Sequence, residues 1–216
     1  ADFVAANGNS LPNAPGCPKP IFNTANDPVM LTMTLRVPSN AHSFKLRSNF
    51  YSAEFPEFTC TQYNDFFVIL LDSTFAGMPG NPADKNLAVY TAPDGSVTPV
   101  GVNLGFGNTG LFTQCVGGKT GCEGLKQGMI NTCTGTGNLT GTGFDDIDSG
   151  ECDAQSMVGG ATGWLTTTGN VVPGEVIKLR IAIWDTSDHR LDSLALIDGF
   201  EWSAEGADPG TVIERR

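Results

Sequence analysis

The sequence has few basic residues, few histidines and no long apolar run. Lys and Arg number 12 against 23 Asp and Glu, which gives a formal net charge of −11. This balance argues against nucleic acid and anionic membrane surfaces as partners, because both are bound through Lys and Arg. No stretch of about 18 apolar residues occurs, so we expect no membrane insertion by this chain. Divalent cations and neutral ligands such as sugars remain compatible with an acidic chain.

Motifs for nucleophilic or zinc-dependent catalysis are also missing. His42 and His189 are the two histidines, and neither G-x-S-x-G nor H-E-x-x-H occurs. A glycosidase needs two carboxylates on opposite sides of a cleft, and the spacing of Glu54, Glu57 and Asp185 does not require that role. We therefore predict a non-catalytic protein without catalytic residues, and keep a glycan-active hydrolase as the alternative.

The six cysteines form no paired CxxC metal motif. Four of them lie in glycine-rich polar loops with little apolar cover, so disulfides in an exported protein are favoured over buried thiols. Spacing alone does not fix the connectivity. Closing local loops first gives the expected pairs Cys115–Cys122, Cys133–Cys152 and, by remainder, Cys17–Cys60. We also expect Ala1 to be the first residue left after removal of a leader peptide at a small-residue site.

Glycine and proline recur between short apolar segments, which is typical of an all-β chain. Alternating apolar residues predict strands over 29–37, 44–50 and 177–183, the first two as a hairpin or as near neighbours in one sheet. The continuous apolar run 66–71 predicts a central strand covered on both faces. Asp94-Gly95 predicts a hairpin between 87–90 and 97–102. Shorter strands are expected at 164–168 and from 194 to about 202.

Roughly eight to ten antiparallel strands fit a two-sheet β-sandwich of jelly-roll type. We expect one such domain over residues 28–203, after an extended N-terminal arm (1–27) and before a polar C-terminal tail (204–216). Residues 103–160 are rich in glycine and hold four cysteines. We interpret them as a long loop insertion tied down by disulfides.

The strongest candidate site is an acidic turn that follows the strand 177–183. Asp185, Asp188 and Asp192 lie at spacings of three and four there, and such a turn repels itself unless a cation, solvent or backbone N–H groups absorb the charge. Calcium takes about six to eight oxygen ligands. If three acidic segments meet at one end of the sandwich, the expected Ca²⁺ ligands are Glu54, Glu57, Asp65, Asp185, Asp188 and Asp192. The alternative is that these side chains bond backbone groups in turns. Asp146 and Asp148 are a weaker candidate, which we interpret as a solvated loop.

Three segments carry a family resemblance: YSAEFPEF, YNDFFVILLD and PGEVIKLRIAIWDTSDHRLDSLALID. In this order they resemble the choice-of-anchor L domain, a family of secreted bacterial surface domains with motifs close to EEFPEY, YNDFF and AIADxxDxxxDSAVFI. The resemblance covers about residues 29–200, and the cysteine-rich loop 111–160 departs from it. It implies an exported module with varied cell-wall or membrane anchors, found in adhesin-like and matrix proteins, and it implies no catalytic activity. We expect no anchor after Arg216.

These observations predict a secreted or cell-surface module for adhesion or extracellular assembly, stabilised by calcium. Its expected partners are other copies of itself, another surface protein or a glycan. In a fibre or matrix subunit, Phe3-Val4 of the N-terminal arm would add a strand to a neighbour's sheet. In a carbohydrate-binding module, exposed aromatic rings would stack on sugars. The candidates for stacking are Tyr63, Trp164, Trp184 and Trp202, although burial is the commoner fate of a strand tryptophan.

Overall fold

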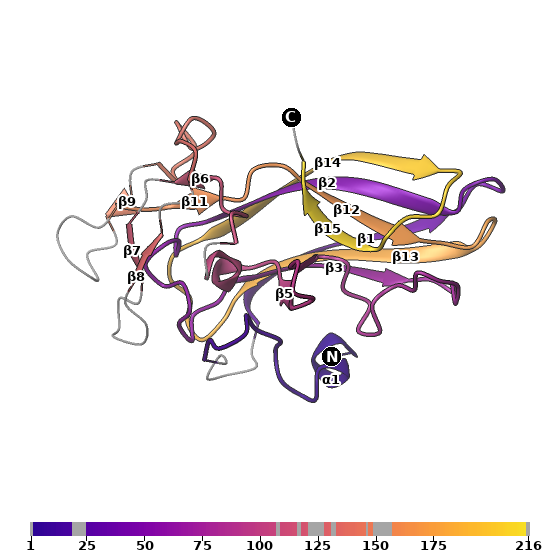
Figure 1. The fold of residues 1–216 in the computed structure, drawn as a ribbon, viewed down its shortest axis with the longest axis horizontal. Helices are drawn as coiled ribbons and strands as arrows, with labels where there is room; N and C mark the ends of the chain where they lie inside the picture. The colour runs from indigo at the N-terminus through magenta and orange to yellow at the C-terminus, as the bar shows by residue number, and fades with distance from the viewer. Residues whose placement is uncertain are drawn as a thin grey trace.

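The computed structural model describes residues 2–18, 25–106, 109–115, 118–120, 128–130, 133–145, 147–148 and 157–214. Within them the fold is all-β, with antiparallel sheets of three and six strands packed together (Figure 1). The elements are α1 (Asp2–Ala6), β1 (Asn26–Arg36), β2 (Ser43–Ser52), β3 (Phe66–Asp72), β4 (Val89–Thr91), β5 (Val97–Pro99), the 3-10 helix η1 (Val102–Gly105), β6 (Gln114–Cys115), β7 (Gly118–Thr120), β8 (Gly128–Ile130), β9 (Ile147–Asp148), β10 (Met157–Val158), β11 (Gly160–Ala161), β12 (Leu165–Asn170), β13 (Val176–Asp185), β14 (Ser193–Ser203) and β15 (Gly210–Ile213).

The three-stranded sheet has the order β1-β13-β3. Alternate residues of β13 and β3 enter the main core between the sheets, among them Leu179 and the register partners Ile181 and Ile69. The opposite face of β3 is buried as well, because Phe66 packs with Trp184, which also contacts Phe3 of the N-terminal segment. The prediction of a strand covered on both faces is therefore confirmed.

β3 ends the strand order rather than lying at its centre, which corrects the expected central position. Its outer edge is covered by residues 85–102. The Leu87 N–H donates to Ile69 O at 2.8 Å, and the Phe67 N–H donates to Val100 O at 3.1 Å. The expected hairpin is confirmed in this segment, where β4 pairs with β5. An irregular chain thus satisfies the backbone groups that an edge strand would leave open.

The six-stranded sheet has the order β15-β12-β2-β11-β6, with β14 on the other edge of β2. The strand expected at 164–168 is β12, and β14 reaches Ser203 as expected. The polar tail predicted for 204–216 is wrong in part, because residues 210–213 form β15 and pair with β12 from Leu165 to Thr168. Val212 points outward there and Thr211 is buried, so the short strand lacks the apolar alternation that would have revealed it.

β1 and β2 do not form the expected hairpin, because they belong to different sheets. The chain crosses between the sheets at the buried residues Val37 and Ala41, and the Val37 N–H donates to Glu175 O at 2.9 Å. Alternating patterns showed that both segments are strands but did not fix their partners. Only part of the apolar face expected for β1 packs against the core. Met33 and Leu35 pack on the core, whereas Val29 and Leu31 are exposed.

The N-terminal arm is not extended throughout, which corrects that prediction. Residues 2–6 form the short helix α1, and Phe3 is buried against Trp184. The Asn7 side chain donates to Asp84 Oδ2 at 3.1 Å and so ties the segment to the loop that precedes β4. The N-terminal segment covers one face of the three-stranded sheet (Figure 1).

Two disulfides occur in the described residues. Cys17–Cys60 is confirmed, and Cys115 pairs with Cys133, so the expected local pairs Cys115–Cys122 and Cys133–Cys152 are wrong. The Cys115 N–H donates to Gly135 O at 3.0 Å, which brings the chain around Cys133 beside β6. Loop proximity in sequence did not anticipate this contact. Cys122, Cys152 and Asp146 lie outside the described residues.

The region 103–160 contains short strands as well as loops, and Leu139 and Phe144 pack there against Tyr51 of β2. None of the helices in the described ranges is long enough and apolar enough to cross a membrane.

Candidate functional site

Strand register brings the three acidic segments to one end of the two sheets. Trp184 of β13 lies opposite Phe66 of β3, so the next residue outward on each chain is Asp185 and Asp65. In the other sheet Ser193 lies opposite Ser52, two residues before Glu54. The segments that carry Glu54, Asp65 and Asp185 therefore lie at the same end of the two sheets, as expected. We call these three side chains the acidic centre.

The acidic centre is buried. Glu54 is 2% exposed, Asp65 is 0% exposed and Asp185 is 8% exposed. Carboxylates are rarely buried to this degree without a partner, because the charged form loses its hydration. Glu54 Oε2 and Asp65 Oδ1 have no hydrogen-bond partner within the described residues. None of the ion pairs in that part of the chain includes a member of the acidic centre.

Burial and like charge both act on these carboxyls. Burial raises the pKa of Glu54 well above its usual range, and the negative charges of Asp65, Asp188 and Asp185 raise it further. Burial likewise raises the pKa of Asp65, with the Asp185 charge as the next cause. The pKa of Asp185 is raised to about 6, by burial first and then by Asp27, Asp192 and Asp188. Burial and like charge thus both disfavour the ionised form of these carboxyls.

Hydrogen bonds fix where the acidic centre lies. Ser193 Oγ, on the six-stranded sheet, donates to Asp65 Oδ2 at 2.7 Å, so the Asp65 carboxylate bridges the two sheets. Asp185 lies within hydrogen-bonding reach of the Asp65 carboxyl. The Asp65 N–H also acts on the Glu54 carboxyl and partly offsets the rise in its pKa that burial causes. The three carboxyls therefore lie around Asp65.

Loop-to-loop bonds hold the surrounding chain. The Asn64 N–H donates to Thr186 Oγ1 at 2.9 Å, and Thr186 Oγ1 donates back to Asn64 O at 3.0 Å. Ser187 Oγ donates to Gln62 O at 3.0 Å, and the Asn26 amide donates to Asp188 O at 2.6 Å. The turn chemistry expected as the alternative is thus present beside the acidic centre, and it uses neutral groups for these bonds.

The remaining expected ligands differ in how exposed they are. Glu57 is buried in the same turn as Glu54, Asp188 is half-buried and Asp192 is exposed. Asp188 Oδ1 accepts from the Arg190 N–H at 3.2 Å. Among the described residues no three His, Cys, Asp or Glu side chains are already arranged as a metal-ligand set.

Sequence reasoning missed Asp27, whose charge acts on Asp185 across the β1–β13 pairing. Its carboxylate Oδ2 lies 2.7 Å from His189 Nδ1, and both side chains are exposed. Asp27 lies near Asp185 because its neighbour Asn26 pairs with Asp185 in the β1–β13 register. The sequence could have indicated this position only if the pairing of β1 with β13 had been known.

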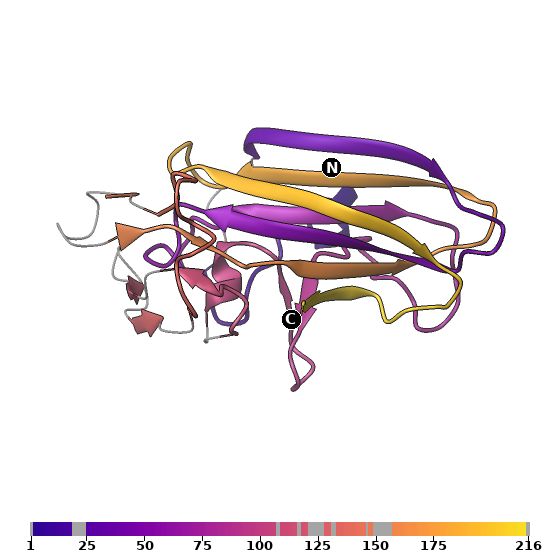
Figure 2. The same cartoon turned by 90° about the horizontal axis from the view of Figure 1, so that it is seen from above.

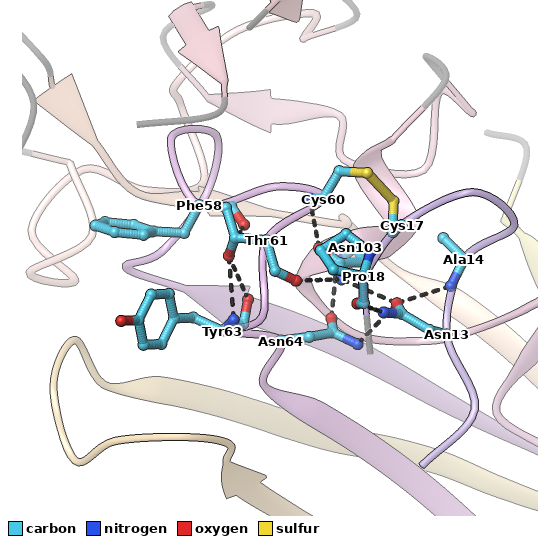
Figure 3. The surroundings of a disulfide bond; sticks show 10 residues. All are labelled: Asn13, Ala14, Cys17, Pro18, Phe58, Cys60, Thr61, Tyr63, Asn64 and Asn103. Carbon is cyan, nitrogen blue, oxygen red and sulfur yellow. Dashed lines mark hydrogen bonds between the residues drawn. A yellow bond between two sulfur atoms is a disulfide. The ribbon is translucent and has the colours of Figure 1, made fainter. Parts of the chain in front are cut away.

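A buried amide network lies beside the Cys17–Cys60 disulfide (Figure 3). Asn103 Oδ1 accepts from the Cys60 N–H at 2.5 Å, and the Asn103 amide donates to Asn13 Oδ1 at 2.9 Å. Asn64 Oδ1 accepts from the Asn103 N–H at 2.8 Å. The network ties the N-terminal segment to the chain that carries Asp65, and nothing in the sequence pattern marked these asparagines.

An open pocket of about 460 Å³ lies at a separate place, between the cysteine-rich region and β15. It is lined by Trp164, Gln114, Asn138, Glu214, three threonines, Gly163 and Ile213. The Arg47 guanidinium lies 4.7 Å from the centre of the Trp164 ring and donates to Glu214 at 2.6 Å. Of the aromatic residues expected to stack on sugars, Trp164 is the one that lines this pocket, while Trp184 is buried.

The fold and the site together define a disulfide-bonded, β-sandwich-like module with a buried acidic centre at one end. A family model described as the Choice-of-anchor L domain matches residues 21–201, so the chain belongs to this family. The resemblance found in the sequence is thereby confirmed. No curated protein and no solved structure gives a significant match to the chain. The two disulfides fit an oxidising environment, which agrees with a family named for anchoring.

Proposed function

We propose that this chain is a non-catalytic module of jelly-roll type that is exported to the cell surface and serves in attachment or extracellular assembly. The observation that carries the proposal is strand β1, whose outer edge pairs with no other strand in the described residues. Figure 2 shows β1 along one side of the molecule, with β13 as its neighbour. An open edge of this length is a template for a strand of another chain.

The exposed part of β1 is apolar. Val29 is 66% exposed, and Met30 and Leu31 beside it are also exposed. Natural edge strands are usually short, charged or covered, as β3 is covered here by residues 85–102. β1 has eleven residues, and Pro28 and the register shift between Asn26 and Val29 interrupt only its start. Residues 29–35 carry no charge and pair on this edge with no strand of the described residues. An edge left in this state favours a binding role over a merely structural one.

A second copy of this chain is the occupant that the charges favour. The segment 28–35, PVMLTMTL, has no charged residue although the whole chain carries −11. Two β1 edges would therefore meet without placing like charges opposite each other. The N-terminal arm does not support the strand-donor role expected for it, because Phe3 is buried in its own domain. The accepting edge, rather than the arm, supports assembly.

The test is self-association measured by sedimentation velocity over a range of concentrations. We expect wild type to form dimers or larger species, and Val29→Lys to weaken association about tenfold or more, because a charge then faces its copy. Val212→Lys is the matched control. Val212 is 59% exposed on β15, so the same change is made away from β1. A wild-type monomer at all concentrations, or equal effects of the two variants, would contradict the assembly role.

The pocket beside Trp164 favours a second candidate, a carbohydrate-binding module. Its lining combines one aromatic ring with amide, hydroxyl and carboxylate groups, which is the composition that sugars bind. A module of this kind should stay monomeric and be retarded on a column of immobilised glycans. Retardation that Trp164→Ala abolishes, without any self-association, would favour this candidate over the first.

A further inference from the structure

We infer that Glu54, Asp65 and Asp185 form a calcium site that joins the two sheets at their acidic end. The inference is independent of the proposed function, since the site lies beyond the exposed part of β1 and would hold loops together whatever the module binds. Its ligands would be carboxylate oxygens from the turn after β2, from the start of β3 and from the end of β13.

Within the described residues, two buried oxygen atoms of the acidic centre have no hydrogen-bond partner. Glu54 Oε2 and Asp65 Oδ1 are buried in a protein that satisfies the neighbouring amides of Asn64 and Asn103 fully. An unpartnered buried carboxylate oxygen costs far more than an unpartnered neutral group. A cation between these carboxylates would supply the missing interaction to several of them at once.

The groups that the acidic centre offers to a ligand are hard oxygen donors. Within the described residues the side chains that converge on Asp65 are carboxylates and the Ser193 hydroxyl. No cysteine or histidine lies among them, and His189 is engaged with Asp27 outside. A set of oxygen donors from three separate segments suits Ca²⁺, which tolerates variable geometry, better than Zn²⁺ or the strictly octahedral Mg²⁺.

The site lies between the two sheets. Asp65 and Asp185 belong to the three-stranded sheet, and Ser193 belongs to the six-stranded sheet, so a cation at Asp65 lies where the two sheets meet. The side chains are not yet arranged as a complete ligand set. Binding would draw the carboxylates together and cancel the repulsion that otherwise opposes their approach. The competing account is a proton shared between Asp65 and Asp185, which needs no metal.

The experiment uses the oxidised protein after chelation. Calcium chloride is titrated into it by calorimetry, and thermal melts are recorded in excess EDTA and in millimolar calcium, with magnesium in a parallel arm. We expect measurable binding heat, a rise in melting temperature of several degrees with calcium, and a smaller rise with magnesium. No heat and no shift would overturn the inference and leave the shared proton as the account of the cluster.

Asp185→Asn removes the charge of one proposed ligand and leaves the more deeply buried Glu54 and Asp65 unchanged. It should weaken calcium binding about tenfold or more. In EDTA it should leave the melting temperature unchanged or higher, because it removes one of several repelling charges. Glu205→Gln, an exposed acid in the β14–β15 connection, is the charge-matched control and should keep the full calcium shift. Equal losses in calcium and in EDTA for Asp185→Asn, or an undiminished calcium shift, would contradict the site.

Discussion

Two buried polar clusters lie side by side and differ in how completely they are satisfied. The amides of Asn13, Asn64 and Asn103 bond to one another and to the backbone near Cys60. Glu54 and Asp65, next to them, keep buried oxygens without partners. Full satisfaction is what a structural network requires, whereas an incomplete one calls for a further group. At the scale of single residues, this contrast is the reason for assigning a ligand to the second cluster only.

Asp72 shows the opposite electrostatic setting and gives a prediction at the residue scale. A hydrogen bond from Lys85 Nζ at 2.6 Å lowers the pKa of Asp72, and Arg180 lies 3.0 Å from the other oxygen. A carboxyl with a lowered folded-state pKa stabilises the fold above its unfolded pKa, near pH 4, and loses that contribution as the pH falls further. Asp72→Asn should therefore lower the free energy of unfolding at pH 7 by only about 0.5 to 1 kcal/mol, since the pair is partly exposed.

Urea unfolding at pH 7 and at pH 2.5 checks this expectation for Asp72. The difference between variant and wild type should be present at pH 7 and much smaller at pH 2.5, because the wild-type carboxyl takes up its proton as the pH falls through its lowered pKa. Glu205→Gln serves again as a control without a designed effect at either pH. A difference that persists at pH 2.5 would mean that shape rather than charge causes the loss.

At the scale of elements, the two edge strands of the three-stranded sheet differ in how far they are covered. β3 is covered by residues 85–102, whereas β1 is left open. At one point of the cover, Gly101 forms a β-bridge with Phe66 of β3. A Cβ at position 101 would lie 2.5 Å from Asp65 O, which is backbone and has little room to move. The covering segment therefore depends on a glycine there.

Gly101→Ala should destabilise the protein by about 1 to 3 kcal/mol, because the overlap forces either the cover or the Asp65 backbone to shift. Gly137→Ala is the matched control, since a Cβ there meets nothing within 4 Å. We expect it to be neutral or slightly stabilising. Urea unfolding of both variants provides the measurement. If Gly101→Ala were as stable as Gly137→Ala, the close approach of the cover to β3 would be wrong.

At the scale of the whole molecule, the N-terminal segment is held to the sandwich by one covalent bond, by the packing of Phe3 and by the hydrogen bonds of Asn7 and Asn13. Cys17 and Cys60 are 43 residues apart in the sequence, so their bond restricts a large part of the unfolded chain. Closing a loop of this length stabilises the folded state by about 4 kcal/mol in the chain-entropy account. The net charge of −11 also makes the folded chain repel itself, and this repulsion lowers the stability of the compact state.

The double variant Cys17→Ser/Cys60→Ser should accordingly lose about 4 kcal/mol of unfolding free energy in urea. Cys115→Ser/Cys133→Ser opens a bond across a separation of only 18 residues and should lose less, about 3 kcal/mol. A wild-type urea midpoint for the first variant would show that the bond does not constrain the chain.

The sequence by itself determined the fold class, the main strands and the family. Period-two alternation in 177–183 and the apolar run 66–71 follow directly from which faces of a strand are buried, so each can be read locally. The three acidic segments were likewise visible as local patterns. Local composition did not reveal β15, whose exposed Val212 and buried Thr211 reverse the usual rule.

Only the tertiary structure decided the partners. It placed β1 and β2 in different sheets, paired Cys115 with Cys133, and brought Asp27 to the acidic centre beside Asp185. It also buried Glu54, Asp65 and Asp185 and left Asp188 half-buried and Asp192 exposed. Each of these outcomes depends on long-range register and on burial. Strand partners and burial are set by the free energy of the whole packed fold, so no single segment of the sequence reveals them.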